Sequence, residues 1–148
     1  MIKQSALEKL YEKAESEKAD MVFFNSDVIF SNEELQNNNK SYLTYYERKN
    51  DYKGILRGKE LMKAMLDNKE YLQSPCLNIV NNEFFKNNEL WFPAGIIHED
   101  NLYMFKAMFN ADKVSYMPDK LYIRRIRQDS TVTRRKTFAH VYGYFYCV

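Results

Sequence analysis

The segment "FPAGIIHEDNLYMFKAMF", residues 92–109, most constrains how this chain folds. Pro93 and Gly95 predict a turn, and a short apolar run leads from that turn to the adjacent acids Glu99 and Asp100. The apolar residues that follow recur at helical spacing, so we expect a helix to begin at the acid pair and to bury one face. Acids in the first turn of a helix are stabilised by the helix dipole and by free backbone N–H groups. The pair is therefore either a helix start or a pair of functional carboxylates at the mouth of a pocket.

Helical and strand-like patterns alternate along the rest of the chain. Apolar residues recur at helical spacing in residues 5–15, 58–68, 82–88 and 133–146. Ser5 followed by Glu8 predicts a capping box at the first of these helices. Runs rich in Val, Ile, Phe and Tyr predict strands at residues 19–30, 76–80, 113–117 and 121–126, with Pro118 between the last two. Residues 31–41 predict a loop, and residues 42–46 and 90–92 predict short extended pieces. This order predicts one α/β domain, residues 1–148, with a mixed sheet and flanking helices.

Composition excludes several classes of protein. The chain has 148 residues, of which 45% are hydrophobic and 28% charged, as in ordinary domains with a sizeable core. The net charge of +2 is close to balance, so it does not indicate nucleic acid or an anionic membrane as a partner. Cys76 and Cys147 have no metal-ligand spacing, which favours a reduced cytoplasmic chain over a disulfide scaffold. No apolar stretch is long enough to span a bilayer.

The two ends of the sequence indicate a piece of something longer. The chain begins almost directly with a helical pattern and stops at "YGYFYCV", inside an apolar pattern. Complete domains usually begin and end in polar, dispensable residues. We therefore expect further residues, or a second chain, to complete the fold.

The acid-pair region resembles family 2 glycosyltransferases of the GT-A fold. In that family an aromatic or "FP-G" segment leads into an "ED" motif at a helix start. The segment "LWFPAGIIHEDNLYMFKAMFNADKVSYMPDKLYIRRIRQDSTVT" looks like that region, including the strands and the "S-T" loop that follow in capsular and exopolysaccharide enzymes. The likeness extends back through "SPCLNIVNNEFFKNNELWF" and "ALEKLYEKAESEKADMVFFNSDVIF". It therefore covers nearly the whole chain, and the acid pair is its most specific part.

The resemblance implies the C-terminal, acceptor-side part of an inverting glycosyltransferase. Asp100 would be the general base that takes a proton from the acceptor hydroxyl, and Glu99 would orient the site. The donor would be a nucleotide-sugar, and the acceptor a saccharide or lipid-linked saccharide in bacterial surface polysaccharide synthesis. This partial GT-A-like fold lacks the family's N-terminal nucleotide-binding half.

The missing half also carries the acids that hold a divalent metal, manganese or magnesium, in this family. No metal ligand is therefore assigned to this chain, and none is expected bound to it. Asp27 follows the helix that the family's metal acids precede, so we interpret it as a strand-end acid. We expect the isolated chain to be inactive.

The basic segment "YIRRIRQDST" is the second candidate for function. By resemblance it lies near the donor diphosphate, where Arg125, Arg127 and Arg124 could donate paired hydrogen bonds and Ser130 could add a hydroxyl. Strand alternation sends Arg125 and Arg127 to one face and Arg124 to the other. A solvated basic edge strand explains the same pattern, and the two readings stay open.

Acceptor contacts are assigned to His98, beside the acids, and to Trp91, whose ring could stack on a sugar. A structural histidine and core packing of the tryptophan are the alternatives. Tyr42, Tyr45 and Tyr46 flank the polar loop and are a further candidate for the acceptor side. The acceptor side is therefore expected to lie around the acidic turn at residues 98–100.

Two other classes of function remain. A binding module could use the basic C-terminal stretch on nucleic acid, but the balanced charge and the lack of an RRM-type or OB-type aromatic signature argue against nucleic acid. An assembly module would complete its fold with another chain, and half of a GT-A sheet would expose an edge that favours homo-oligomers. We expect a cytoplasmic location, with peripheral contact at the inner face of the membrane as an open alternative.

Overall fold

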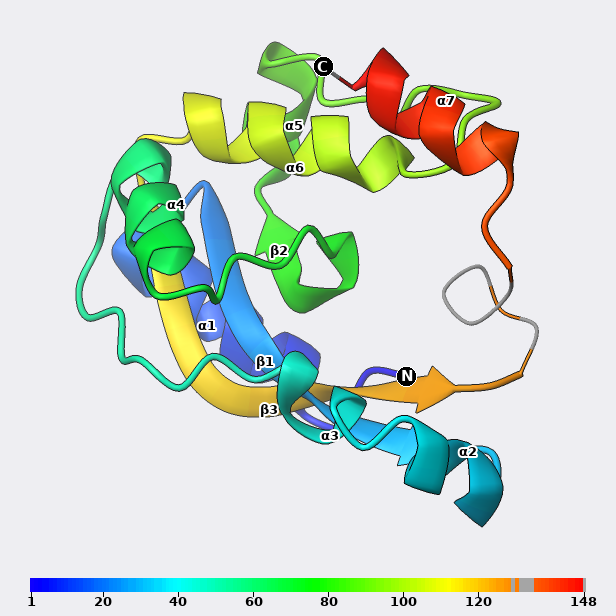
Figure 1. The fold of residues 1–148 in the computed structure, drawn as a ribbon. Coiled ribbons are helices and arrows are strands. Elements are labelled where there is room, and N and C mark those ends of the chain that lie inside the picture. Colours follow the sequence, from blue (N-terminus) through cyan, green and yellow to red (C-terminus); the bar gives the residue numbers. More distant parts are fainter. Residues whose placement is uncertain (129, 131–134, 148) are drawn as a thin grey trace.

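The computed structural model describes residues 1–128, 130 and 135–147, which form a mixed α/β fold. Its helices are α1 (Ala6–Glu17), α2 (Glu33–Asn38), α3 (Tyr42–Tyr45), α4 (Gly58–Asp67), α5 (Asn82–Asn87), α6 (Glu99–Asn110) and α7 (Phe138–Tyr146), with a 3-10 turn at Pro75–Leu77. Its strands are β1 (Met21–Phe30), β2 (Asn78–Val80) and β3 (Val114–Ile126). In this part of the chain the sheet has the order β2-β1-β3, with β2 antiparallel and β3 parallel to β1 (Figure 1). The predicted α/β class is confirmed.

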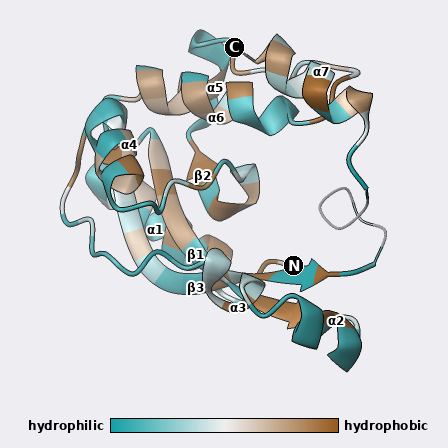
Figure 2. Cartoon of the chain, viewed as in Figure 1, coloured by the Kyte–Doolittle hydropathy of each residue, from teal (hydrophilic) through white to brown (hydrophobic). Residues whose placement is uncertain are grey.

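The central strand β1 is buried on both faces over residues 21–24. Met21 and Phe23 belong to a core cluster that includes Met65 of α4 and Met104 of α6. Val22 and Phe24 belong to a second cluster, which includes Ala6 and Leu10 of α1. The run "MVFF" therefore lacks the alternation of a half-exposed strand because helices cover both of its faces. Figure 2 shows the hydrophobic colour along this strand.

The prediction of two strands around Pro118 is wrong, because β3 is one strand that runs from Val114 to Ile126. Its pairing with β1 shifts in register between Phe23 and Ser26, opposite the proline. The Asn25 side-chain amide fills this irregularity, since it donates to the carbonyl of Pro118 (3.2 Å) and to the hydroxyl of Tyr116 (2.8 Å). A bulge accommodates a proline that a regular ladder would exclude.

Predictions from local propensity are also wrong at the start of the first helix and in residues 31–46. Within the described residues Ser5 makes no side-chain cap to α1, because its backbone is left-handed (φ 58°). The loop predicted at residues 31–41 contains α2, whose start is capped by Asn32. The extended piece predicted at residues 42–46 is the short helix α3. Its tyrosine rings pack on one another, and these contacts override their preference for strands.

The remaining elements follow the sequence pattern closely. The helices predicted at residues 58–68 and 82–88, and the helix after the acid pair, are present as α4, α5 and α6. The strand predicted from Cys76 begins two residues later, at Asn78, after the 3-10 turn. The last helix begins at Phe138, and part of its predicted start, residues 133–134, lies outside the described residues.

Helices α4 and α6 approach so closely that the first residue of α4 must be glycine. A Cβ atom at Gly58 would lie 2.0 Å from the backbone oxygen of Met108 and 3.2 Å from the Cβ of Ala111. The Gly58 N–H donates to the carbonyl of Ala111 (2.9 Å), which fixes the contact. This contact holds the C-terminal end of α6 and so the direction of the whole helix.

Replacing Gly58 by alanine should destabilise the fold, although alanine is the better helix former. The clash is with backbone, so α4 must move away from α6, and overpacking of this kind costs about 1–3 kcal/mol. Thermal and urea unfolding of Gly58→Ala measure the loss. Lys63→Ala, at an exposed position of the same helix, is the control and should change stability by less than about 0.5 kcal/mol. Equal stability of both variants would contradict the close approach.

Candidate functional site

A cavity of about 680 Å³ opens beside the acid pair. Its walls come from four parts of the chain: the turn into α6, the helix α3 with the segment before the 3-10 turn, the strand β3, and the α7 region. The lining residues are Tyr42, Tyr45, Tyr46, Leu72, Gln73, Ser74, Ile96, Ile97, His98, Glu99, Asp100, Arg124, Lys136 and Tyr144. The fold thus gathers residues separated by up to a hundred positions around the acidic turn.

A strained turn presents the two acids to this cavity. Gly95 (φ 80°) and His98 (φ 71°) both have left-handed backbones, and α6 begins directly after His98. Glycine adopts this conformation freely, whereas a histidine held there stores about 1–3 kcal/mol of strain. In the described structure the His98 side chain does not cap the helix. The turn therefore leaves the start of α6 without a side-chain cap from His98 and places residues 98–100 in the lining of the cavity.

Asp100 is a desolvated carboxyl group. Burial raises its pKa above the ordinary value of 3.8, and the neighbouring Glu99 raises it further. His98 and the backbone N–H groups at the start of α6 act in the opposite direction, but they do not cancel the effect of burial. A carboxylate with a raised pKa is a stronger base than a solvated one.

The lining of this cavity also carries positive charge. The Arg124 guanidinium lies 4.6 Å from the centre of the Tyr46 ring, within range of a cation–π contact. Burial raises the pKa of Tyr46 to about 12, and the arginine opposes that rise. Lys136 lines the same cavity. A carboxyl group with a raised pKa and two cations therefore share one open site, which suits a substrate that carries both a hydroxyl group and negative charge.

Helix α7 contributes to the cavity lining and packs directly on the acidic turn. A Cβ atom at Gly143 would lie 1.8 Å from the backbone oxygen of Ile97, so only glycine fits. The ring of Tyr144 stacks on that of His98, with centroids 4.0 Å apart. The Cys147 thiol donates to the backbone oxygen of His98 (3.5 Å). Burial under α7 lowers the pKa of His98, with Asp100 opposing the change, so His98 is mainly neutral at pH 7.

The structure brings together seven of the side chains that the sequence singled out. Asp100, Glu99, His98 and Arg124 line one cavity, and so do Tyr42, Tyr45 and Tyr46. The lining within the described residues does not include the other predicted site residues, which are Arg125, Arg127, Ser130 and Trp91. Their roles stay predictions.

The two groups differ in exposure and packing. Arg125 and Arg127 are exposed, whereas Arg124 is half-buried, in line with the predicted alternation. Trp91 is largely exposed and packs edge-on against Phe85, at 4.9 Å between ring centroids. Thr131, whose hydroxyl the sequence offers as a second donor beside Ser130, lies outside the described residues.

Sequence reasoning missed two residues of the site. Lys136 is exposed just before α7, as its basic surroundings predict, but the sequence did not show that it also lines the cavity. Tyr144 belongs to a helix whose position over the acids no local pattern shows. The isolated Gly143 inside an apolar helical run was the available signal, because such a glycine often marks a close backbone approach.

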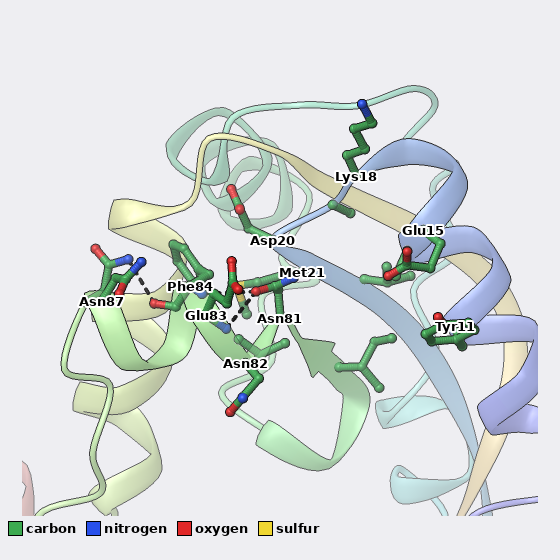
Figure 3. A pocket seen from close by; sticks show the side chains of 16 residues that line it. Tyr11, Glu15, Lys18, Asp20, Met21, Asn81, Asn82, Glu83, Phe84 and Asn87 are labelled. Carbon is green, nitrogen blue, oxygen red and sulfur yellow. Dashed lines mark hydrogen bonds between the residues drawn. The ribbon is translucent and has the colours of Figure 1, made fainter.

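A second cavity, of about 650 Å³, lies between α1 and the region of β2 and α5 (Figure 3). Asn81 caps α5 beside it and accepts hydrogen bonds from the N–H groups of Glu83 (2.8 Å) and Phe84 (3.0 Å). Ile79 and Val80 of β2 line this cavity. It therefore runs along the edge of the sheet, away from the acid pair.

No candidate metal-ligand cluster occurs in the described residues. These residues contain no group of three or more His, Cys, Asp or Glu side chains placed to hold an ion. Asp27, the acid closest in sequence to a metal motif, forms ion pairs with Lys3 and Lys120. Among the helices in the described ranges, none is both long and apolar enough to cross a bilayer.

Comparison with solved structures shows that this chain has part of a glycosyltransferase fold. Two structures of TarS from S. aureus match it, and the chain spans about a third of their length. TarS 1-349 in complex with UDP-GlcNAc gives a TM-score of 0.64 at 18% identity, over 92% of this chain and 35% of that chain. The second structure of TarS 1-349 gives a TM-score of 0.57 at 19% identity, over 82% of this chain and 32% of that chain. No protein-family model and no curated protein sequence matches.

Replacing Asp100 by asparagine should leave the folded protein equally or more stable at neutral pH. Because the folded-state pKa is raised, the charged form is less favourable in the folded than in the unfolded chain. The wild type therefore loses stability as the pH rises from 3.8 through that higher pKa, whereas Asp100→Asn does not. Melting temperatures are measured for both proteins at a series of pH values. The melting temperature of Asp100→Asn should exceed that of the wild type by an amount that grows as the pH rises.

Glu83→Gln is the matched control, because Glu83 is an exposed acid in the first turn of α5. It should lower stability at neutral pH by about 0.3–1 kcal/mol through the lost helix-dipole interaction. If Asp100→Asn behaves like Glu83→Gln, the acids serve the helix start rather than a reaction.

Proposed function

We propose that this chain is the acceptor-side part of an inverting glycosyltransferase, with Asp100 as its general base. One observation carries the proposal: a desolvated carboxyl group with a raised pKa lines an open cavity that also contains Arg124. The partial glycosyltransferase fold supports it independently. The resemblance of the acid pair to the "ED" motif points to the same residue.

In the proposed reaction Asp100 accepts the proton of an acceptor hydroxyl as that oxygen attacks the anomeric carbon of a nucleotide-sugar. The bond to the diphosphate breaks on the opposite side of the sugar, so the configuration inverts. A base is most effective when its pKa approaches the working pH, and burial of Asp100 moves its pKa in that direction. The tyrosines of α3 and the stacked His98 form the walls that would orient the acceptor.

The cations of the cavity suit a negatively charged group. Arg124 is held over Tyr46, and Lys136 lies in the same lining, so both could meet a phosphate without a large rearrangement. The TarS structure that matches best of the two contains UDP-GlcNAc. A uridine diphosphate sugar is therefore the first donor to test, and a saccharide of a bacterial surface polymer the first acceptor. On this proposal the acids that hold a metal belong to a nucleotide-binding part outside this chain.

On this proposal turnover needs a nucleotide-binding part as well, so it is measured on a protein that combines such a part with this chain. Asp100→Asn keeps the shape of the side chain but cannot accept the proton, and loss of a general base costs about 10²–10⁴ in rate. Glu99→Gln should lose less, because its proposed role is orientation. Release of the nucleoside diphosphate from the donor measures both rates, with donor affinity unchanged.

The chain alone provides the control. Calorimetry with UDP-GlcNAc and manganese should detect no micromolar binding by the 148 residues, because the nucleotide is assigned to the other part. Metal-dependent micromolar binding would contradict this division of the fold. A fully active Asp100→Asn enzyme would contradict the role of the base.

The open edge of β2 favours a second candidate, an assembly module that pairs with another chain. The Asn81 N–H donates to Asp20 on the β1 side (2.8 Å), so the N–H and C=O of the preceding Val80 point to the other edge. No strand of the described residues pairs with that edge. The second cavity runs along it. An added strand would satisfy these groups and fill the cavity.

Light scattering should therefore report a dimer or a larger species, formed through the edge of β2. Asn82→Arg places a long cation in the exposed lining of the second cavity and should shift the protein toward a monomer. Asn37→Arg, at an exposed position of α2, adds the same charge elsewhere and should leave the dimer intact. A wild-type protein that stays monomeric at high concentration would exclude self-assembly through this edge.

A further inference from the structure

Helix α7 turns its apolar side to the solvent. Phe138, Val141, Tyr142 and Phe145 occupy positions i, i+3, i+4 and i+7, so they share one face. Their exposed fractions are 80%, 62%, 49% and 80%. A surface helix of a globular domain normally shows polar residues on this side. Figure 2 shows hydrophobic segments along α7, at the outside of the molecule.

The opposite face of α7 is fixed to the protein. His140 and Gly143 are buried, and Gly143 makes the close backbone contact with Ile97. The His140 ring nitrogen Nδ1 accepts a hydrogen bond from the Thr137 N–H (3.1 Å) and so closes the start of the helix. The helix cannot rotate its aromatic side inward without losing these contacts, so the exposed face is a stable feature of the surface.

The charged side chains of the α7 segment itself have one sign. Arg135 and Lys136 precede the helix and are exposed, and residues 135–147 contain no acid. Tyr142 and Tyr146 carry phenol groups that can reach polar headgroups while their rings stay in apolar surroundings. Large apolar side chains, tyrosines and a basic flank on one helix are the combination found in helices that lie in a membrane interface.

We propose that α7 is an interfacial anchor that lays its aromatic face in the surface of an anionic lipid bilayer. Helix α7 lies at the outside of the fold (Figure 1), so its aromatic face can meet an extended surface such as a bilayer. The basic flank matches the negative charge of such a surface. Because α7 also borders the cavity of Asp100, the bilayer would lie close to that cavity.

Sedimentation with lipid vesicles tests the anchor on the 148-residue chain. The wild type should bind vesicles of phosphatidylcholine mixed with phosphatidylglycerol, and bind pure phosphatidylcholine more weakly. Phe138→Ser with Phe145→Ser should lower the partition coefficient roughly tenfold or more, because two apolar side chains no longer leave water. Arg135→Gln should lower it about fivefold on the mixed vesicles alone.

The matched control is Leu7→Ser with Tyr11→Ser on α1, which lies away from α7 in Figure 1. These residues are 63% and 64% exposed, so the control removes comparable exposed apolar side chains. Binding should persist in the control, and circular dichroism checks that all variants are folded. Equal loss of binding in both double variants would overturn the proposal, and so would a wild type that ignores anionic vesicles.

Fluorescence gives a second readout, because Trp91 is the one tryptophan of the sequence. In a Trp91→Phe background, a tryptophan introduced by Phe145→Trp should shift to shorter wavelength with anionic vesicles and be quenched by brominated lipids. A tryptophan introduced by Tyr11→Trp should do neither. If the Phe138→Ser, Phe145→Ser variant instead dissociates a wild-type dimer and the Phe145→Trp probe does not respond to lipid, a second copy covers this face and the lipid proposal fails.

Discussion

The burial of β1 on both faces is the constraint on which the rest of the structure depends. Four consecutive side chains, Met21–Phe24, are removed from water, which is possible only while α1 covers one face and α4 and α6 cover the other. The same strand sets the register of β3, where Val28 lies opposite Arg124. The acidic wall of the cavity, carried by α6, and its basic wall, carried by β3, are thus both positioned by one buried strand.

A buried polar network ties the third wall to the same strand. The Asn25 Oδ1 accepts a hydrogen bond from the Arg48 N–H (3.0 Å), and the Arg48 Nη1 donates to the backbone oxygen of Phe24 (3.0 Å). Burial lowers the pKa of Arg48 to about 10, so the residue stays charged at neutral pH inside the fold. The Ser26 N–H donates to the backbone oxygen of Tyr46 (3.0 Å). These bonds hold Tyr46 where Arg124 can lie over its ring.

Local patterns in the sequence were enough to predict most of the helices and strands and the acidic part of the site. The acid pair before an apolar helix predicted Asp100 at an element end, because caps, turns and periodicity act over a few residues. Predictions from local patterns are wrong where contacts between distant residues determine the structure. Pro118 stays within one strand because Asn25, on the neighbouring strand β1, fills the bulge. Lys136 and Tyr144 reach the cavity only because α7 folds back over His98, a packing that no short segment encodes.

The contact between Gly143 and Ile97 joins two backbones with no side chain between them. Side chains can absorb a small displacement by changing rotamer, but two peptide groups in van der Waals contact cannot. A shift of α7 toward the acidic turn would therefore have to move the backbone at Ile97, three residues before Asp100. The position of α7 and the position of the turn that carries the carboxyl group are linked at this one backbone contact.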